Sequence, residues 1–337
     1  MRYAKHIVKA AAGLVAAGLL AATAACGPGD SGSASADQGK GGGSSSESAQ
    51  PAIPFDVSPL LHPDKKYFGV AEDKAPHTMA PVDQYAGMVG KQPNLVAYYA
   101  EWGAGFDASG VRRAWKSGAL TLMSWEPFHV SLADIAAGKQ DAYLRTYATA
   151  VRQLNLPVVI DFADEFNGNW ENWGTKHVTP KEFVGAWRHM HDVFGDVGAA
   201  NVIWAWSPNI VNPVPQVKLE PYYPGDAYVD WVGMIGYFTI GSDNAFDSVF
   251  GPTMRQVRTF SKKPFIILET AAEPGERRRA DVRNLFQGVT SDDDLLGFVW
   301  FDYHKRADWR LKVSPLALAE FKRLASDDLF GFDVRKP

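Results

Sequence analysis

The chain has 337 residues, of which 46% are hydrophobic and 21% charged, and its formal net charge is -4. This composition allows one large buried core or two smaller ones. The mildly acidic balance, without a basic patch, argues against a nucleic-acid partner.

The first 26 residues have the pattern of a secretory signal. Arg2, Lys5 and Lys9 precede the apolar run Ala10–Ala25, and the chain's single cysteine, Cys26, follows directly. The run is too short and too weakly apolar to predict a membrane span. We expect a lipoprotein signal with a lipidated Cys26, which predicts an extracellular protein anchored to the cell membrane. Because the usual Leu three positions earlier is missing, ordinary cleavage after a small residue is the alternative.

The segment 27–52 is rich in Gly and Ser and contains no Val, Ile, Leu, Met or aromatic residue. Such a segment cannot bury enough surface to offset its ordering entropy, so we expect a flexible linker. From residue 53 to residue 337 there is no second linker and no repeat with a solenoid period, which predicts a single domain. Without a second cysteine, no internal disulfide can form, and stability has to come from packing.

Short apolar runs alternate with longer amphipathic segments through this domain. The predicted strands are Tyr67–Val70, Leu95–Tyr99, Leu120–Trp125, Val158–Phe162, Val202–Trp206, Trp231–Tyr237, Phe265–Glu269 and Gly297–Phe301. The clearest predicted helices are Leu132–Leu154, Pro180–Val193, Thr253–Phe260, Glu276–Phe286 and Pro315–Leu324. Eight strands that alternate with helices predict a closed parallel (β/α)8 barrel. An open doubly wound sheet is the competitor, but the first strand is not followed by its typical glycine-rich phosphate loop.

Polar and aromatic residues gather where the predicted strands end. They are Glu126, Glu165, Asn209, Tyr237, Glu269 and Asp302, in the order of the third to eighth strands. Barrel enzymes carry their chemistry at the C-terminal ends of the strands. The recurrence therefore predicts a functional site at that end of the barrel.

Glu165 and Glu269 are the best-placed pair of carboxyl groups, because the ends of the fourth and seventh strands face each other across a barrel mouth. Two such groups cleave a glycosidic bond by protonating one side and supplying negative charge on the other. A carboxyl separation of about 5–5.5 Å accompanies retention of configuration, and roughly 6.5–9.5 Å accompanies inversion. Glu269 follows an apolar strand and needs a hydrogen-bond donor, for which Tyr237 is a candidate.

The sequence also resembles glycoside hydrolase family 26, whose best-known members are secreted β-mannanases. The resemblance covers most of the chain between Tyr67 and Leu311. It rests on Ser124-Trp125-Glu126-Pro127, Glu165-Phe166-Asn167-Gly168-Asn169-Trp170, Trp206-Ser207-Pro208-Asn209, Tyr222-Tyr223-Pro224-Gly225-Asp226, Gly236-Tyr237, Leu268-Glu269-Thr270 and Trp300-Phe301. The order and spacing of these motifs are specific as a set.

The resemblance implies a (β/α)8 barrel, retention of configuration and no cofactor. It places the acid/base on Glu165 and the nucleophile on Glu269, and it implies that Trp170, Tyr237 and Trp300 line the sugar site. We add Asp164, Asn167 and Trp125 as predicted substrate contacts, and we predict no metal site. The implied partner is a polysaccharide bound by a monomer: β-1,4-mannan first, with mixed-linkage β-glucan or β-1,3-xylan behind it.

Two residues depart from the family pattern. Asp164 stands where the family usually has His, and Asp161 where it usually has Arg. By like-charge coupling, the two acids are expected to raise the pKa of Glu165 or to make Asp164 share its proton. They motivate an alternative function, a carbohydrate-binding surface lipoprotein that keeps the barrel without catalysis. A transport solute-binding lipoprotein is a third hypothesis, which requires two domains and a hinge.

Overall fold

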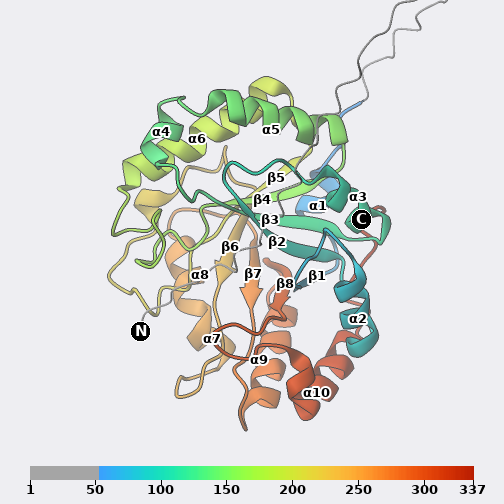
Figure 1. Ribbon diagram of the computed structural model, residues 1–337. Helices are drawn as coiled ribbons and strands as arrows, with labels where there is room; N and C mark the ends of the chain where they lie inside the picture. The colour runs from blue at the N-terminus through green and yellow to red at the C-terminus, as the bar shows by residue number, and fades with distance from the viewer. Residues whose placement is uncertain (1–52) are drawn as a thin grey trace, which may run out of the picture. The chain divides into compact units, whose positions relative to one another are not determined.

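The computed structural model describes residues 53–337, which fold around eight parallel strands (Figure 1). The predicted signal segment 1–26, with Cys26, and the linker 27–52 lie outside the described residues. The strands are β1 (Tyr67–Ala71), β2 (Leu95–Glu101), β3 (Leu120–Glu126), β4 (Val158–Phe162), β5 (Val202–Trp206), β6 (Trp231–Ile235), β7 (Phe265–Thr270) and β8 (Leu295–Phe301). They pair in chain order and β8 pairs with β1, so the sheet closes into a barrel. The predicted (β/α)8 barrel is confirmed.

The strands are continuous apolar runs because both of their faces are covered. Nearly every strand residue is buried, as expected for a parallel sheet with side chains inside the barrel and helices outside it. The sixth strand ends at Ile235, two residues earlier than predicted. A register shift at Met234 and Ile235 interrupts its pairing with β7 at that point. Tyr237 therefore lies in the loop after β6 and not in the barrel wall.

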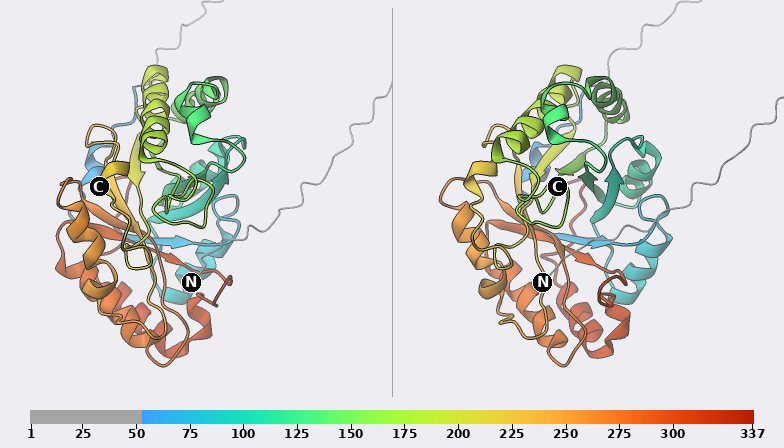
Figure 2. Two further views of the ribbon diagram at one scale, coloured as in Figure 1. Left: turned by 90° about the vertical axis from the view of Figure 1, so that its left-hand side faces the viewer. Right: turned by 60° about the vertical axis from the view of Figure 1, so that its left-hand side comes forward.

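The helices lie outside the ring of strands, as Figure 2 shows. They are α1 (Ser58–Leu61), α2 (Ala80–Val89), α3 (Ala108–Lys116), α4 (Leu132–Ala136), α5 (Asp141–Leu154), α6 (Pro180–Val197), α7 (Phe246–Val249), α8 (Gly251–Val257), α9 (Arg278–Ser291) and α10 (Pro315–Ala325). Two 3-10 helices, η1 (Glu220–Tyr222) and η2 (Leu311–Val313), lie in the loops. Within residues 53–337, no helix combines the length and the hydrophobicity that a bilayer span requires.

The helix predicted over Leu132–Leu154 is two helices in the structure, α4 and α5. Between them Gly138 has a φ of +74°, a left-handed conformation that ends α4 and that glycine adopts without steric cost. The apolar periodicity on either side of Gly138 concealed this break.

The chain enters β4 through a defined helix end. Helix α5 ends at Leu154, as predicted from the sequence, and the next residue, Asn155, has a left-handed φ of +50°. The Asn155 side chain also accepts a hydrogen bond from the Phe55 backbone N–H (2.8 Å) and donates one to the Ile53 carbonyl (2.9 Å). Beyond β4, Thr179 and Glu182 form a capping box that begins α6. The segment that carries Glu165 thus lies between two fixed helix ends.

Candidate active site

Glu165 lies in the loop after β4 and is 5% exposed. Its φ of +54° is in the left-handed region, which residues other than glycine rarely adopt and which occurs at functional sites. Its backbone N–H donates to the Ser207 carbonyl (2.9 Å) just after β5. Its Oε1 accepts a hydrogen bond from Asn209 Nδ2 at 2.5 Å, and its Oε2 accepts one from Trp170 Nε1 at 3.2 Å. The Glu165 carboxyl is therefore held by neutral N–H donors from its own loop and from the loop after β5.

The contact between Trp170 and Glu165 depends on a glycine. A Cβ atom on Gly168 would lie 2.4 Å from the Trp170 indole, so only glycine lets the ring fold back over the loop. Trp170 is half-buried and remains a candidate sugar contact, as predicted from the sequence.

Asn167 has a different role from the predicted one. It is 0% exposed, its Nδ2 donates to the Asn209 carbonyl, and its Oδ1 accepts from the Asn209 backbone N–H, both at 2.8 Å. Because both ends of the Asn167 amide are bonded to the Asn209 main chain, the expectation that Asn167 contacts substrate is wrong. Asn167 fixes Asn209, which in turn binds Glu165.

Glu269 is the fifth residue of β7 and is 3% exposed. The Tyr237 hydroxyl donates to its Oε1, so Tyr237 is the donor that the sequence suggested. A second hydroxyl, that of Tyr99 in β2, donates to its Oε2. Sequence reasoning missed Tyr99, which lies 170 positions from Glu269 in the chain. The available signal was its place at the C-terminal end of a predicted strand.

One hydrogen-bond donor to each of the two glutamates lies in the loops after β5 and β6. Strands β4 and β7 are separated by β5 and β6 in the closed barrel. Asn209, which binds Glu165, pairs as a β-bridge with Ile235 at the end of β6. Asn209 and Tyr237 also line one cavity of about 280 Å³. Donors to the two carboxyl groups therefore border the same cavity.

Two predicted sugar contacts, Trp125 and Trp300, are 0% exposed. Trp125 stacks on Tyr147 of α5, with ring centroids 4.3 Å apart. Trp300 packs against Phe321 of α10 at 5.2 Å. Both indoles fill the layer between strands and helices, so the expectation that they line the sugar site is wrong.

The aromatic side chain that β8 contributes to the mouth is Phe301. Its ring lies edge-on to the Tyr99 and Tyr237 rings, at 6.5 and 6.1 Å. It also stacks on Tyr303, with centroids 4.6 Å apart. Lys305 holds its ammonium 5.5 Å from the Tyr99 and Tyr303 ring centroids. The side of the mouth near Glu269 is thus aromatic, with one exposed cation beside it.

The two departures from the family pattern are buried acids. Asp161 is 0% exposed, and its Oδ1 accepts a hydrogen bond from Ser207 Oγ at 2.6 Å. Asp164 is 1% exposed, and its carbonyl accepts from Trp173 Nε1 at 2.7 Å. Asp161 therefore links β4 to the segment after β5, and the predicted substrate contact of Asp164 stays a prediction.

A second pair of carboxyl groups, Glu72 and Asp302, lies where β1 and β8 end. Burial and, after it, the charge of Asp302 and its hydrogen bond with Glu72 together raise the pKa of Glu72 to about 8. Burial also raises the pKa of Asp302, against the backbone N–H of Leu311, which donates to its Oδ1 at 2.7 Å. Glu72 therefore keeps a proton at neutral pH, and Asp302 anchors the loop between β8 and η2. This arrangement gives the pair a structural role beside the site.

The sequence model of glycosyl hydrolase family 26 matches residues 135–260 of the chain. Endoglucanase H of Acetivibrio thermocellus is 29% identical over 257 residues, which are 72% of this chain and 28% of that protein. Mannan endo-1,4-β-mannosidase of Bifidobacterium adolescentis is 27% identical over 150 residues, which are 42% of this chain and 14% of that protein. The chain thus spans less than a third of the length of either relative.

The fold is shared with solved structures. A modular endo-β-1,4-mannanase from Cellulomonas fimi superimposes with a TM-score of 0.63 over 81% of this chain and 73% of its own, at 18% identity. At this low sequence identity, the structural similarity shows a shared fold and nothing about activity. The family match and the relatives confirm the resemblance that the sequence motifs indicated: the chain is similar in sequence to the family 26 glycoside hydrolases, and it shares the fold of a family 26 mannanase.

Proposed function

We propose that the chain is an endo-acting, retaining glycoside hydrolase that cleaves a β-1,4-linked polysaccharide. The observation that carries the proposal is the pair of buried glutamates, Glu165 and Glu269, each of which accepts hydrogen bonds from two neutral donors. Glu165 follows β4 and Glu269 lies in β7, and the ends of these strands face each other across the barrel mouth. Glycoside hydrolysis requires two carboxyl groups in different surroundings, and this site provides them.

The hydrogen bonds suggest how the two roles are divided. Two hydroxyl groups, those of Tyr99 and Tyr237, donate to Glu269, and donors of this kind stabilise a negatively charged carboxylate. Glu165 is bonded closely at Oε1 by Asn209, whereas the bond from Trp170 to its Oε2 is longer, at 3.2 Å. Oε2 is therefore the oxygen of Glu165 that can carry a proton to a substrate.

In the first step, Glu165 gives its proton to the glycosidic oxygen while Glu269 attacks the anomeric carbon. The bond to the leaving sugar breaks, and a covalent bond between Glu269 and the remaining sugar forms. In the second step, Glu165 takes a proton from water, and that water displaces Glu269. Two inversions at the same carbon give net retention, and Glu165 ends protonated as it began.

The relatives support a β-linked glucan or mannan as substrate, because one is named an endoglucanase and another a mannan endo-1,4-β-mannosidase. A polysaccharide of this kind is met outside the cell. We therefore propose that the protein acts there as a monomer, tethered through the predicted lipid on Cys26 and the linker 27–52.

Reducing-sugar release from β-mannan, mixed-linkage β-glucan, cellulose and β-1,3-xylan, measured across pH, tests the function. We expect release from a β-glucan or a β-mannan, with a fast fall in viscosity because an endo-acting enzyme cuts within chains. Absence of release from every polysaccharide, with retarded migration in a gel that contains one of them, would instead favour a carbohydrate-binding protein without catalysis. The buried acids Asp161 and Asp164 are the observation that keeps this second function in view.

Tyr99→Phe is expected to lower kcat about 10- to 100-fold, because a hydrogen bond to a charged group contributes roughly 1.5–3 kcal/mol. The ring remains, and Tyr237 still donates to Glu269. The matched control is Tyr98→Phe, one residue earlier in β2, whose buried hydroxyl has no hydrogen-bond partner among the described residues. Steady-state kinetics and thermal unfolding of both variants are the measurements. If both variants turn over like the wild type, Tyr99 does not support Glu269.

A further inference from the structure

We propose that Arg278 is a positioning residue for the nucleophile. It fixes the loop after β8, in which Trp309 packs on Tyr237 and keeps the Tyr237 hydroxyl on Glu269. The inference rests on the proposed function and adds a buried residue to it. Arg278 is the first residue of α9, the helix that follows β7, and it is 1% exposed. Because its side chain is buried, a polysaccharide does not contact it, and its effect on the reaction has to pass through its neighbours.

The guanidinium of Arg278 holds the segment of the β8 loop that carries Trp309. Its Nη2 donates to the Trp309 carbonyl at 2.6 Å, and its Nη1 donates to Ser314 Oγ at 3.1 Å. The 3-10 helix η2 lies between these two acceptors in the chain. One planar group thus fixes both ends of η2, which the fork of an arginine can do and a single ammonium cannot.

Arg278 is charged although it is buried. Burial lowers the pKa of its guanidinium to about 10, and the charges of Asp302 and Asp308 oppose that shift. The guanidinium also lies 6.0 Å from the centroid of the Trp300 ring, close enough for a cation–π contact. Burying a cation is unfavourable unless hydrogen bonds and opposite charges compensate for the lost water. These contacts supply that compensation, so the guanidinium stays protonated at neutral pH and keeps both acceptors.

Trp309 connects this anchor to the nucleophile. It is 8% exposed, and its ring lies on that of Tyr237, with centroids 4.8 Å apart and planes at 37°. Tyr237 lies in the loop after β6 and not in the barrel wall, so the direction of its hydroxyl depends on the rings that pack against it. That hydroxyl donates to Glu269 Oε1. A shift of the Trp309 main chain would therefore loosen a hydrogen bond that stabilises the ionised nucleophile.

The base of the same loop has an anchor of its own, Asp302. Its backbone N–H donates to the Ala71 carbonyl at the end of β1 (3.1 Å), and its Oδ1 accepts from the Leu311 N–H (2.7 Å). Neither of these bonds involves Arg278. Loss of the Arg278 guanidinium should therefore leave the loop attached to the barrel and change chiefly where Trp309 lies.

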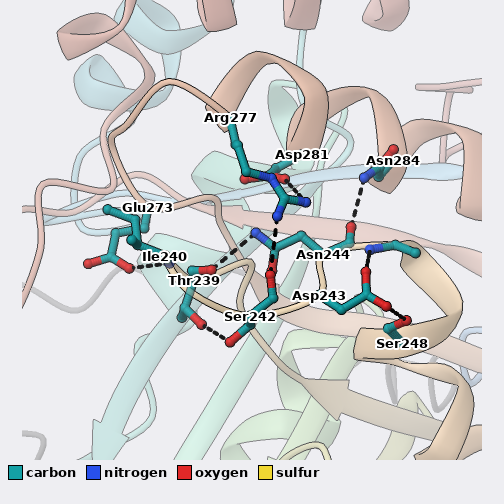
Figure 3. A network of polar contacts seen from close by, with 11 residues as sticks. Thr239, Ile240, Ser242, Asp243, Asn244, Ser248, Glu273, Arg277, Asp281 and Asn284 are labelled. Atoms are coloured by element: carbon teal, nitrogen blue, oxygen red, sulfur yellow. Dashed lines mark hydrogen bonds and ion pairs between the residues drawn. The ribbon is translucent and has the colours of Figure 1, made fainter.

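The start of α9 also holds the loop after β6, on the other side of β7 (Figure 3). Arg277 Nη1 donates to the Ser242 carbonyl at 3.3 Å, and Asn284 Nδ2 donates to the Asn244 carbonyl at 2.7 Å. Successive residues of a helix point about 100° apart, so Arg277 and Arg278 reach different loops. The helix that follows the nucleophile strand thus fixes the loops on both sides of that strand, and a tyrosine from one loop meets a tryptophan from the other.

Arg278→Met tests the assignment through the pH dependence of kcat/KM on the polysaccharide that the protein hydrolyses. The low-pH limb of this profile reports ionisation of the nucleophile in the free enzyme. If the Tyr237 hydroxyl no longer stabilises the carboxylate, the pKa of Glu269 rises and the limb moves to higher pH. We expect a shift of about one pH unit, which lowers kcat/KM about tenfold at pH values below the wild-type limb. A merely structural role of Arg278 would lower the melting temperature and leave the limb in place.

A double-variant cycle identifies the route of the effect. In a Tyr237→Phe background the hydroxyl is already absent, so Arg278→Met should not move the limb further. A direct electrostatic effect of the lost positive charge on Glu269 would instead persist in that background. Arg278→Lys retains the charge in case Arg278→Met does not fold. Because its ammonium cannot hold both acceptors, its limb should shift in the same direction by a smaller amount.

The matched control is Arg279→Met, at the next residue of α9. Arg279 is exposed and pairs with Glu320 at 3.3 Å, and two other arginines still bind that carboxylate in the variant. Its pH profile should match that of the wild type. A wild-type limb in both Arg278 variants, or an equal shift with and without the Tyr237 hydroxyl, overturns the positioning role and leaves the proposed function intact. A wild-type protein that hydrolyses no polysaccharide overturns the proposed function, and the positioning role with it.

Discussion

Glu269→Ala is expected to lower kcat on the preferred polysaccharide by at least about 10⁴-fold, because it removes the group that forms the covalent intermediate. Tyr99 and Tyr237 remain in place, but their hydroxyl groups no longer face a carboxylate. Substrate binding should persist, since the other residues of the mouth are unchanged. Turnover and calorimetric titration with an oligosaccharide separate the two effects.

Chemical rescue gives this prediction a readout that misfolding cannot imitate. Azide is small enough to occupy the space left by the Glu269 carboxylate and attacks the anomeric carbon from the same face. It should restore cleavage of an activated aryl β-glycoside, releasing the phenolate and yielding a glycosyl azide of inverted, α configuration. Glu276→Ala, at an exposed glutamate of the loop that follows β7, is the control and should behave as wild type. Wild-type turnover by Glu269→Ala would remove the nucleophile assignment.

The barrel could be predicted from the sequence because parallel strands covered on both faces are continuous apolar runs. Val158–Phe162 and Val202–Trp206 have the predicted bounds, and so the ends that carry Glu165 and Asn209 could be located. The bounds of the helices were harder to predict. Gly138, which has a left-handed φ, separates α4 from α5. The spacing of apolar residues continues on both sides of Gly138, so the pattern does not reveal the break.

The direction of side chains is where prediction of the site failed. Neighbouring residues of a strand point to opposite faces of the sheet. A prediction that is off by one residue therefore selects a side chain that packs against the helices instead of one at the barrel mouth. Phe301 faces the tyrosines that hold Glu269, whereas Trp300, one residue earlier, packs under α10. Trp125 is likewise on the helix side of β3. Motif resemblance identified the strand ends correctly, and in these two strands it selected the wrong neighbour.

Long-range hydrogen bonds were the other limit. The bond from Tyr99 to Glu269 joins β2 to β7, and the paired bonds of Asn167 and Asn209 join the loops after β4 and β5. No local pattern in the sequence encodes either connection. A single sequence therefore indicated Glu165 and Glu269 themselves but not most of the residues that hold them, apart from Tyr237.

Glu165→Ala is expected to act selectively, and the selectivity identifies its role. General acid catalysis contributes about 10²–10⁴-fold when the leaving group is a sugar, whose oxygen leaves poorly without a proton. A dinitrophenyl leaving group departs without one, so Glu269 can still form the covalent intermediate in Glu165→Ala. We therefore expect a fall of about 10²–10⁴-fold in kcat/KM on polysaccharide and little change in kcat/KM on the aryl glycoside.

The second step should then limit turnover of the aryl glycoside by Glu165→Ala, because no base activates water. A burst of dinitrophenol followed by a slow steady rate is the expected trace, and azide, which needs no base, should raise the steady rate. Azide displaces Glu269 from the face opposite to it, so the product is a β-glycosyl azide, of configuration opposite to that from Glu269→Ala. Losses of equal size on both substrates, without a burst, would mean that Glu165 is not the acid/base. The contrast between the two azides thus assigns both carboxyl groups from products alone.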